Sequence, residues 1–496
     1  MVHFVLSTSR AMAWVGYVLN LISLLAALHI VFQKDKGAYK LTWVFLILLF
    51  PVFGGLLYLM FMFQVPIRRA QLRIEELKRQ TQTQYMQTEG VCKNAAERAP
   101  GCEAQVRYLE NCAGFPSYTH TQTQYYPIGE AYFEALLEAV KQAERYVFLE
   151  YFIVQEGKMW NSILDVLFEK AAQGVDVRLI YDDVGCFFLL PKDYKRFLEQ
   201  HGIRAYVFNP FRPFLSTLQN NRDHRKIAVI DGNVAFTGGI NLADEYINAI
   251  EKHGHWKDVG VRLEGAAAWS FTVMFLQMWD VDNKVLDYNT YVNVDYKSQG
   301  KAEGYVLPYG DSPLDGERVG EMVYMDIVNK AERYVHIMTP YLILDYEMLQ
   351  ALTFAAKRGV EVCIILPHIP DKKYAFALAK THYKDLIAGF LCFIGVLLVW
   401  LSFNQFDHSP DSNIVARRTS AILERRMKQL ESYMQDAHSQ DISKWIDLGE
   451  IPEDMVIYRY CNDTLQSWVN EFPVSNDDIR TRAYMPFVPN PRISII

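Results

Sequence analysis

Residues 220–248 read NNRDHRKIAVIDGNVAFTGGINLADEYIN and contain the spacing His-x-Lys-x4-Asp, formed by His224, Lys226 and Asp231. The KIAVID part predicts a strand, which would put the side chains of His224 and Lys226 on the same face. A neutral imidazole is a nucleophile near physiological pH and can form a covalent intermediate. Lysine supplies the fixed positive charge that a transferring phosphoryl group requires. The stretch therefore predicts a phosphate-reactive site beside one strand.

Two glycines and an asparagine follow this strand and extend the predicted site. Gly238, Gly239 and Asn241 bring backbone amides and a side-chain amide close to the face of His224, where they could hold phosphate oxygens. The alternative gives His224 a capping or solvated position and Lys226 a surface ion pair, with no chemistry. The reactive interpretation is favoured because the motif, the strand and the glycine pair occur together.

Cysteine usage argues against a metal centre and against a disulfide framework. The chain has seven cysteines, and none of them forms a C-x-x-C pair. Structural zinc sites need cysteine and histidine ligands at characteristic close spacings. We therefore predict no metal and no cofactor.

Length and composition bound the protein further. With 496 residues, of which 51% are hydrophobic and 22% charged, the chain is long enough for several domains and too apolar to be largely disordered. The formal net charge of −7 gives no reason to expect a nucleic-acid partner, because a dedicated nucleic-acid domain is usually strongly basic.

Helix-like and strand-like segments alternate from Tyr126 onward. The pattern predicts helices over 129–143, 162–174 and 192–202 and strands over 145–154, 175–183 and 203–209. Alternation of this kind predicts an α/β layer structure.

Part of this pattern recurs later in the chain. AERYV at 143–147 reappears at 331–335, 188 residues on, and AAQGVDV at 171–177 reappears as AAKRGVEV at 355–362, where the Gly-Val pair is offset by 185. An internal repeat predicts two similar α/β units.

Apolar stretches predict a membrane anchor. Residues 12–32 and 41–63 are each about as long as a membrane-spanning helix. The denser cations follow the second stretch, which predicts a cytoplasmic catalytic part and a basic helix that can bind anionic lipid headgroups; these cations are Arg68, Arg69, Arg73, Lys78 and Arg79. A third apolar run, 386–403, predicts a short membrane helix, with a buried core helix as the alternative.

The sequence resembles the phospholipase D superfamily and, within it, the bacterial cardiolipin synthases. The resemblance covers residues 12–389 and rests on the anchor, NRDHRKIAVIDGNVAFTGGINLADEY, HGHWKDVGVRLEG, YGDSP, MTPYLI and AAKRGVEVCIILP. It implies an enzyme of the bacterial inner membrane that joins two phosphatidylglycerol molecules into cardiolipin and glycerol, without metal. In that family each half contributes one H-x-K motif, so that one histidine is the nucleophile and the other is the acid and base.

The same resemblance implies roles for individual residues. His224, Lys226 and Asp231 match the first catalytic motif, and Asn241 matches its trailing phosphate-contacting position. Asp258 matches an acidic residue that could orient the imidazole of His224.

The second half of the chain lacks its motif. The repeat offset places it at 409–412, where the sequence is SPDS, and the other H-x-K triplets, at His255 and His382, lack the following aspartate. A homodimer could complete the site, by analogy with single-motif members of the superfamily. The alternatives are a phospholipase D-type hydrolase that uses water as the acceptor, and a catalytically impaired or chimeric membrane protein.

These observations predict five regions. They are a two-helix membrane anchor (1–66), a basic juxtamembrane helix and linker (67–120), a first phospholipase D-like domain (121–300), a partial second copy (301–389), and a further membrane helix with a polar tail (390–496).

Overall fold

The computed structural model describes residues 2–33, 37–62, 65–87, 90–211, 221–281, 287–292, 302, 304–312, 316–383, 385–386, 457–461, 464–469 and 493–495. The chain divides into two compact units, residues 1–320 and 321–496, which are described separately.

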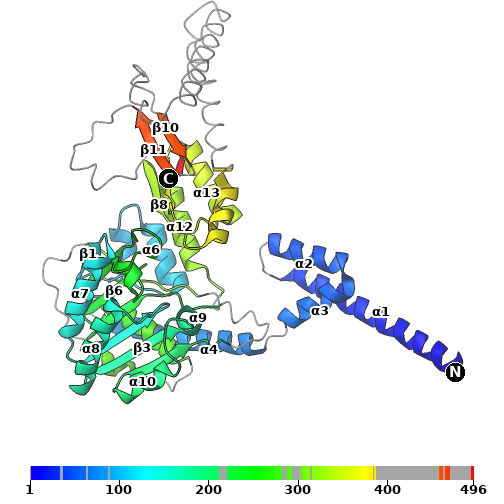
Figure 1. Ribbon diagram of the computed structural model, residues 1–496, viewed down its shortest axis with the longest axis horizontal. Helices are drawn as coiled ribbons and strands as arrows, with labels where there is room; N and C mark the ends of the chain where they lie inside the picture. The colour runs from blue at the N-terminus through cyan, green and yellow to red at the C-terminus, as the bar shows by residue number, and fades with distance from the viewer. Residues whose placement is uncertain are drawn as a thin grey trace, which may run out of the picture. The chain divides into compact units, whose positions relative to one another are not determined.

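A seven-stranded mixed sheet organises the first unit (Figure 1). Its strands lie in the order β1-β7-β6-β5-β2-β3-β4. Strands β2, β3 and β4 are parallel, and the remaining neighbours are antiparallel. The strand bounds are β1 Thr121–Tyr126, β2 Tyr146–Tyr151, β3 Asp176–Asp182, β4 Arg204–Phe208, β5 Ile227–Ile230, β6 Val234–Gly238 and β7 Gly260–Gly265.

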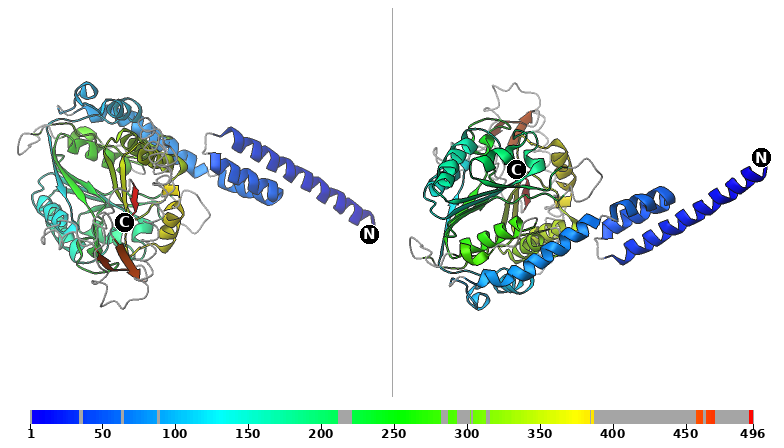
Figure 2. Two further views of the ribbon diagram at one scale, coloured as in Figure 1. Left: turned by 90° about the horizontal axis from the view of Figure 1, so that it is seen from above. Right: turned by 90° about the horizontal axis from the view of Figure 1, so that it is seen from below.

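Helices cover both faces of this sheet, which explains why its central strands are continuously apolar (Figures 1 and 2). Val147 and Leu149 of β2 pack with α7 (Gly129–Lys141), α8 (Lys158–Ala172) and α10 (Tyr194–Gln200). Tyr146 and Phe148 point the other way and pack with α11 (Ala268–Trp279). The alternation of helices and strands predicted for 129–209 is confirmed.

The second unit repeats the parallel strand pair of the first. Strand β8 (Tyr334–Met338) pairs with β9 (Glu361–Ile365) so that Tyr334 lies opposite Glu361. In the first unit Tyr146 lies opposite Asp176, and these residues precede their counterparts by the offsets of 188 and 185 found in the sequence. The predicted internal repeat is confirmed down to the strand register.

The other elements of the second unit surround this pair. Strand β12 (Ile493–Ile495) lies beside β9, as β4 lies beside β3 in the first unit. Helices α12 (Val319–Lys330) and α13 (Tyr346–Lys357) precede β8 and β9, and strands β10 (Ile457–Cys461) and β11 (Thr464–Val469) form an antiparallel pair.

The place that β5 takes in the first unit has no counterpart among the described residues of the second. Strand β5 lies beside β2, whereas β8 is the edge strand of its described three-stranded sheet. The expected position of a second motif, 409–412, and almost all of the apolar run 386–403 lie outside the described residues.

The anchor differs from the prediction in its second apolar stretch. Helix α1 (Val2–Phe32) includes Trp14–Phe32, which is long and apolar enough to cross a membrane. The single helix predicted over 41–63 is wrong, because the chain bends at Phe50 between α2 (Gly37–Leu49) and α3 (Pro51–Met62). With 13 residues, α2 is about 20 Å long, less than the roughly 30 Å of a bilayer core.

Proline and glycine explain the bend. Pro51 has no N–H to continue the helical hydrogen bonds. A Cβ atom at Gly54 would lie 2.8 Å from the carbonyl oxygen of Leu46, and one at Gly55 would lie 2.1 Å from Ser23 Oγ. Only glycine therefore allows α3 to lie so close to α2 and to α1.

The basic helix predicted after the anchor is present as α4 (Val65–Thr81) and packs on α11. Gln277 Nε2 donates to Thr81 Oγ1 at 2.6 Å, and Arg73 Nη2 donates to the carbonyl oxygen of Asp280 at 3.4 Å. The α/β sheet is thus attached to the helix that follows the anchor.

Candidate active site

Strand directions bring most of the predicted site residues to one edge of the sheet. Because β5 runs antiparallel to β2, the residues that precede β5 lie at the edge where β2 ends. His224 and Lys226 directly precede β5, Gly238 ends β6, and Asp258 lies two residues before β7. The carboxyl edge of parallel strands is also where α/β proteins usually bind ligands.

A buried carboxylate fixes the loop that carries His224. Asp182 ends β3, and its Oδ2 accepts a hydrogen bond from the Asp223 N–H at 3.0 Å. Its Oδ1 accepts from Arg222 Nη1 at 3.1 Å and from the Gly185 N–H at 3.0 Å. Charge-assisted bonds of this kind are strong, so the backbone before β5 is held against the end of β3.

His224 and Lys226 meet on the ring of Phe152, which follows β2. The imidazole lies 4.9 Å from the Phe152 ring, centroid to centroid, and Lys226 Nζ lies 5.7 Å from the same centroid. Lys226 Nζ also donates to the carbonyl oxygen of His224 at 2.6 Å. The strand begins at Ile227, one residue later than KIAVID suggests, and the shared contact with Phe152 puts the two side chains together.

The surroundings set the charges of both groups. Partial burial, followed by the Lys226 charge, lowers the pKa of His224 to about 4. Burial lowers the pKa of Lys226 to about 8, against the opposing effect of the Asp223 and Asp258 carboxylates. At pH 7 the imidazole is therefore neutral and nucleophilic, and most of the lysine carries its charge.

Asp258 acts on Lys226 in this arrangement. Its Oδ1 accepts from the Val259 N–H at 2.8 Å, and its Oδ2 lies 3.5 Å from Trp256 Nε1. Burial raises the pKa of Asp258, while Lys226 is among the charges that lower it. The opposing charge that bears on His224 is that of Asp223, so the structure associates Asp258 with the ammonium group and not with the imidazole.

The glycine pair lets β6 and β7 approach each other closely. A Cβ atom at Gly239 would lie 2.1 Å from Asp258 Oδ1, and one at Gly238 would lie 2.3 Å from the carbonyl oxygen of Val259. The Gly239 N–H already donates to that same carbonyl at 3.1 Å. The structure thus gives both glycines a packing role, and phosphate binding by their amides remains a prediction.

Asn241 connects two segments beside the site. It is buried, its Oδ1 accepts from the Ile153 N–H at 3.0 Å, and its Nδ2 donates to the Tyr246 hydroxyl at 2.7 Å. An amide nitrogen has two hydrogens, so Asn241 can hold Tyr246 and still donate to a phosphate oxygen.

Asp231 lies at the opposite edge of the sheet, and the structure does not bring it together with His224 and Lys226. Its carboxylate accepts three backbone N–H groups at 2.8 Å each, from Glu144, Arg145 and Tyr146 at the start of β2. Five strand residues separate it from Lys226, roughly 16 Å. Asp231 is therefore a positioning residue that fixes β5 to β2.

Sequence reasoning missed Phe152 and Asp182. Phe152 belongs to LEYFIV, an apolar segment that is indistinguishable from core in the sequence. Asp182 was detectable in principle, because a carboxylate at the end of an otherwise apolar strand, such as VDVRLIYDD, often marks the ligand-binding edge.

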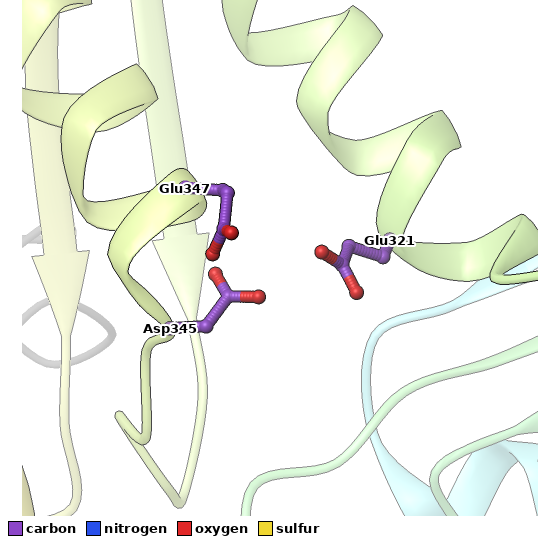
Figure 3. Close-up of side chains that lie close together, drawn as sticks. All are labelled: Glu321, Asp345 and Glu347. Carbon is purple, nitrogen blue, oxygen red and sulfur yellow. The ribbon is translucent and has the colours of Figure 1, made fainter. Parts of the chain in front are cut away.

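The second unit contains one cluster of carboxylates among the described residues that is close enough for a metal ion. Ligand oxygens of Glu321, Asp345 and Glu347 lie within 4.8 Å of one another (Figure 3). Asp345 Oδ1 also accepts from the Met348 N–H at 2.9 Å and so caps α13. Capping accounts for one of the three carboxylates, and exposed acidic groups often cluster without a metal.

Comparisons with known proteins agree with this geometry. A family described as "Cardiolipin synthase, PLD-like domain" matches residues 136–262 and 324–429, and one described as "Phospholipase_D-nuclease N-terminal" matches residues 21–61. The second PLD-like match thus extends past residue 389 into residues that the structure does not describe.

Curated relatives cover most of the chain. A cardiolipin synthase from Geobacillus sp. (strain WCH70) is 32% identical over 75% of this chain and 76% of its own length. An uncharacterized protein from Streptococcus mutans is 47% identical over 73% of this chain and 78% of its own length. Among solved structures, phosphatidylserine synthase from Haemophilus influenzae is similar with a TM-score of 0.41 and 15% identity, over 61% of this chain and 74% of that one.

The fold and the site therefore define a phosphatidyltransferase of the phospholipase D superfamily. The chain belongs to the family of PLD-like cardiolipin synthases. Membership, together with the apolar helix Trp14–Phe32, supports a membrane-associated bacterial protein that acts on phospholipid.

Replacing Asp231 tests its positioning role. Asp231→Ala removes the acceptor for three N–H groups, and we expect the thermal midpoint of unfolding to fall by about 5–10 °C. Asp231 has a φ of +54°, so Asp231→Gly is the matched variant that removes the carboxylate without left-handed strain. Midpoints within 2 °C of the wild type for both variants, in detergent (about the precision of such a comparison), would show that the carboxylate does not fix β5.

Proposed function

We propose that the protein condenses two phosphatidylglycerol molecules into cardiolipin and glycerol through a phosphohistidine on His224. The observation that carries this proposal is the neutral imidazole of His224 beside the buried Lys226 ammonium group. Family membership supports phospholipid as the substrate.

The first step forms the covalent intermediate. A ring nitrogen of His224 attacks the phosphorus of the first phosphatidylglycerol, and the bond from phosphorus to the headgroup glycerol oxygen breaks. Lys226 stabilises the negative charge that spreads over the phosphoryl oxygens. The departing glycerol oxygen takes a proton from a general acid and leaves as glycerol.

The second step returns His224 to its starting form. A glycerol hydroxyl of the second phosphatidylglycerol attacks the phosphorus and gives its proton to the same group, now acting as a base. The bond between phosphorus and His224 breaks, and cardiolipin is released.

The general acid comes from a second copy of the chain in this proposal. His224 belongs to the one H-x-K-x4-D motif in the sequence, and a two-fold dimer would bring two copies of His224 to one site. The edge strand β8, which has no described neighbour where β2 has β5, supports the view that a single chain does not supply a second motif.

Water is the competing acceptor, and one observation favours it. The His224 side chain is exposed to solvent on the side away from Phe152. If water attacked the phosphohistidine, the protein would be a phospholipase D-type hydrolase that releases phosphatidic acid.

We further propose that the protein crosses the membrane more than once and that its α/β domain is cytoplasmic. The proposal rests on α1, on the paired short helices α2 and α3, and on the cations of α4. Protease should digest residues 121–281 in inverted vesicles and spare them in intact spheroplasts; the reverse pattern would contradict the orientation.

A mixing experiment tests turnover and the dimer together. In detergent, conversion of labelled phosphatidylglycerol to cardiolipin should rise more steeply than linearly with chain concentration. His224→Ala should abolish it, because loss of such a group typically costs ~10²–10⁴ in rate from the acid alone, and an equal mixture with wild type should keep about a quarter of the activity.

The matched control for this experiment is His382→Ala, which removes the histidine of an incomplete H-x-K triplet and should leave the rate unchanged. Full activity that is linear in wild-type concentration would refute the dimer. Activity that survives His224→Ala would remove the nucleophile assignment, and phosphatidic acid as the main product would favour the hydrolase.

The pH dependence of turnover tests the role of Lys226. Its pKa is lowered to about 8, and the charged form is the active one, so kcat/KM should fall as the pH rises through about 8. Lys226→Arg keeps the charge at every accessible pH, so its residual activity should lack this alkaline fall. A fall at the same pH in both enzymes would assign it to another group.

A further inference from the structure

Exposed apolar side chains gather beside α9 (Asp183–Cys186), the short turn that follows β3. Phe188 is 92% exposed, and Phe187 and Phe211 are 51% and 50% exposed. The Phe187 ring lies 4.9 Å from that of Phe188 and 5.7 Å from that of Phe211. We call these three residues the aromatic patch. Clustered exposed aromatic rings usually mark an interaction surface.

The aromatic patch is fixed to the catalytic edge of the sheet. A Cβ atom at Gly185 would lie 2.0 Å from the carbonyl oxygen of Phe152, so the α9 turn packs directly on the residue that contacts His224. The Phe211 N–H donates to Asp183 Oδ2 at 2.7 Å. Asp182 holds both the α9 turn, through Gly185, and the His224 loop.

The route of the chain identifies what this patch meets. Helix α3 ends at Met62 and α4 begins at Val65, so the connection between them reaches at most about 10 Å. Helix α4 is in turn packed on α11 of the α/β domain. The catalytic sheet therefore starts directly after the apolar helices and stays close to the lipid surface.

We propose that the aromatic patch inserts into the lipid bilayer beside the catalytic edge and holds His224 at the level of the phospholipid headgroups. This inference rests on the proposed function, since a substrate with two acyl chains can reach His224 without leaving the bilayer only if that edge faces the lipid. Aromatic and aliphatic side chains at such a rim bury about 5–10 Å deep, at the boundary of headgroups and acyl chains.

Site-specific crosslinking tests the insertion without depending on turnover. Phe188 is replaced by the photo-crosslinking amino acid p-benzoylphenylalanine in the full chain, which is reconstituted in phosphatidylglycerol vesicles and irradiated. Mass spectrometry should find a phospholipid adduct on the peptide that contains position 188. The matched control is the same replacement at Phe354 of α13, which is 60% exposed and should give no lipid adduct.

The outcomes separate this inference from the proposed function. His224→Ala should abolish turnover and leave the lipid adduct at position 188 unchanged. Equal lipid labelling at 188 and 354, no lipid adduct at 188, or an adduct to protein in place of lipid would each overturn the insertion.

Kinetics give an independent readout. The double variant Phe187→Ser and Phe188→Ser should raise the KM for phosphatidylglycerol in vesicles by about tenfold, the effect of withdrawing roughly one buried phenylalanine side chain. The KM for a short-chain phosphatidylglycerol that is soluble as a monomer should stay unchanged, as should both values in Phe354→Ser. Equal increases for both substrates would show that the patch acts on the site itself and not through the bilayer.

Discussion

The antiparallel pairing of β5 with β2 is the constraint on which the site depends. Its register runs from Val147 opposite Ile230 to Glu150 opposite Ile227, and both strands are buried on both faces. A slip by one residue would exchange the two faces of β5 and is strongly resisted where both faces are packed. The residues just before β5 are thereby brought to the edge where β2 ends.

Two carboxylates hold this pairing at its opposite ends. Asp231 receives three N–H groups from the start of β2, and Asp182 receives the Asp223 N–H beside the reactive loop. Between these two fixed points the chain has little freedom, so His224 and Lys226 keep their place on Phe152. Preorganisation of this kind lets fixed charges act on a transition state without reorganisation.

The local pattern of the sequence predicted the fold well because it depends on short-range periodicity. The helices and strands between 129 and 209 were visible as alternating apolar segments, and the repeat offsets gave the register of β8 and β9. The second apolar stretch was misjudged because hydrophobicity alone measures length, whereas Pro51 and Gly54 decide whether that length forms one straight helix.

The site was predictable in part, for a related physical reason. His224 and Lys226 are two residues apart, so their proximity is local. Asp231 belongs to the same motif but lies one strand length away, and its partners are backbone amides that no sequence pattern marks. Phe152 comes to His224 from 72 residues earlier in the chain, a contact that only the strand order produces.

The central claim is that His224 forms a covalent bond to phosphorus, and the most direct measurement is to trap that bond. The protein is mixed with phosphatidylglycerol labelled in its phosphate, quenched within one turnover at alkaline pH, digested, and analysed by mass spectrometry. The account predicts a phosphatidyl adduct on residue 224 of the wild-type chain and none in His224→Ala. An adduct on another residue, or an equal adduct in His224→Ala, would contradict it.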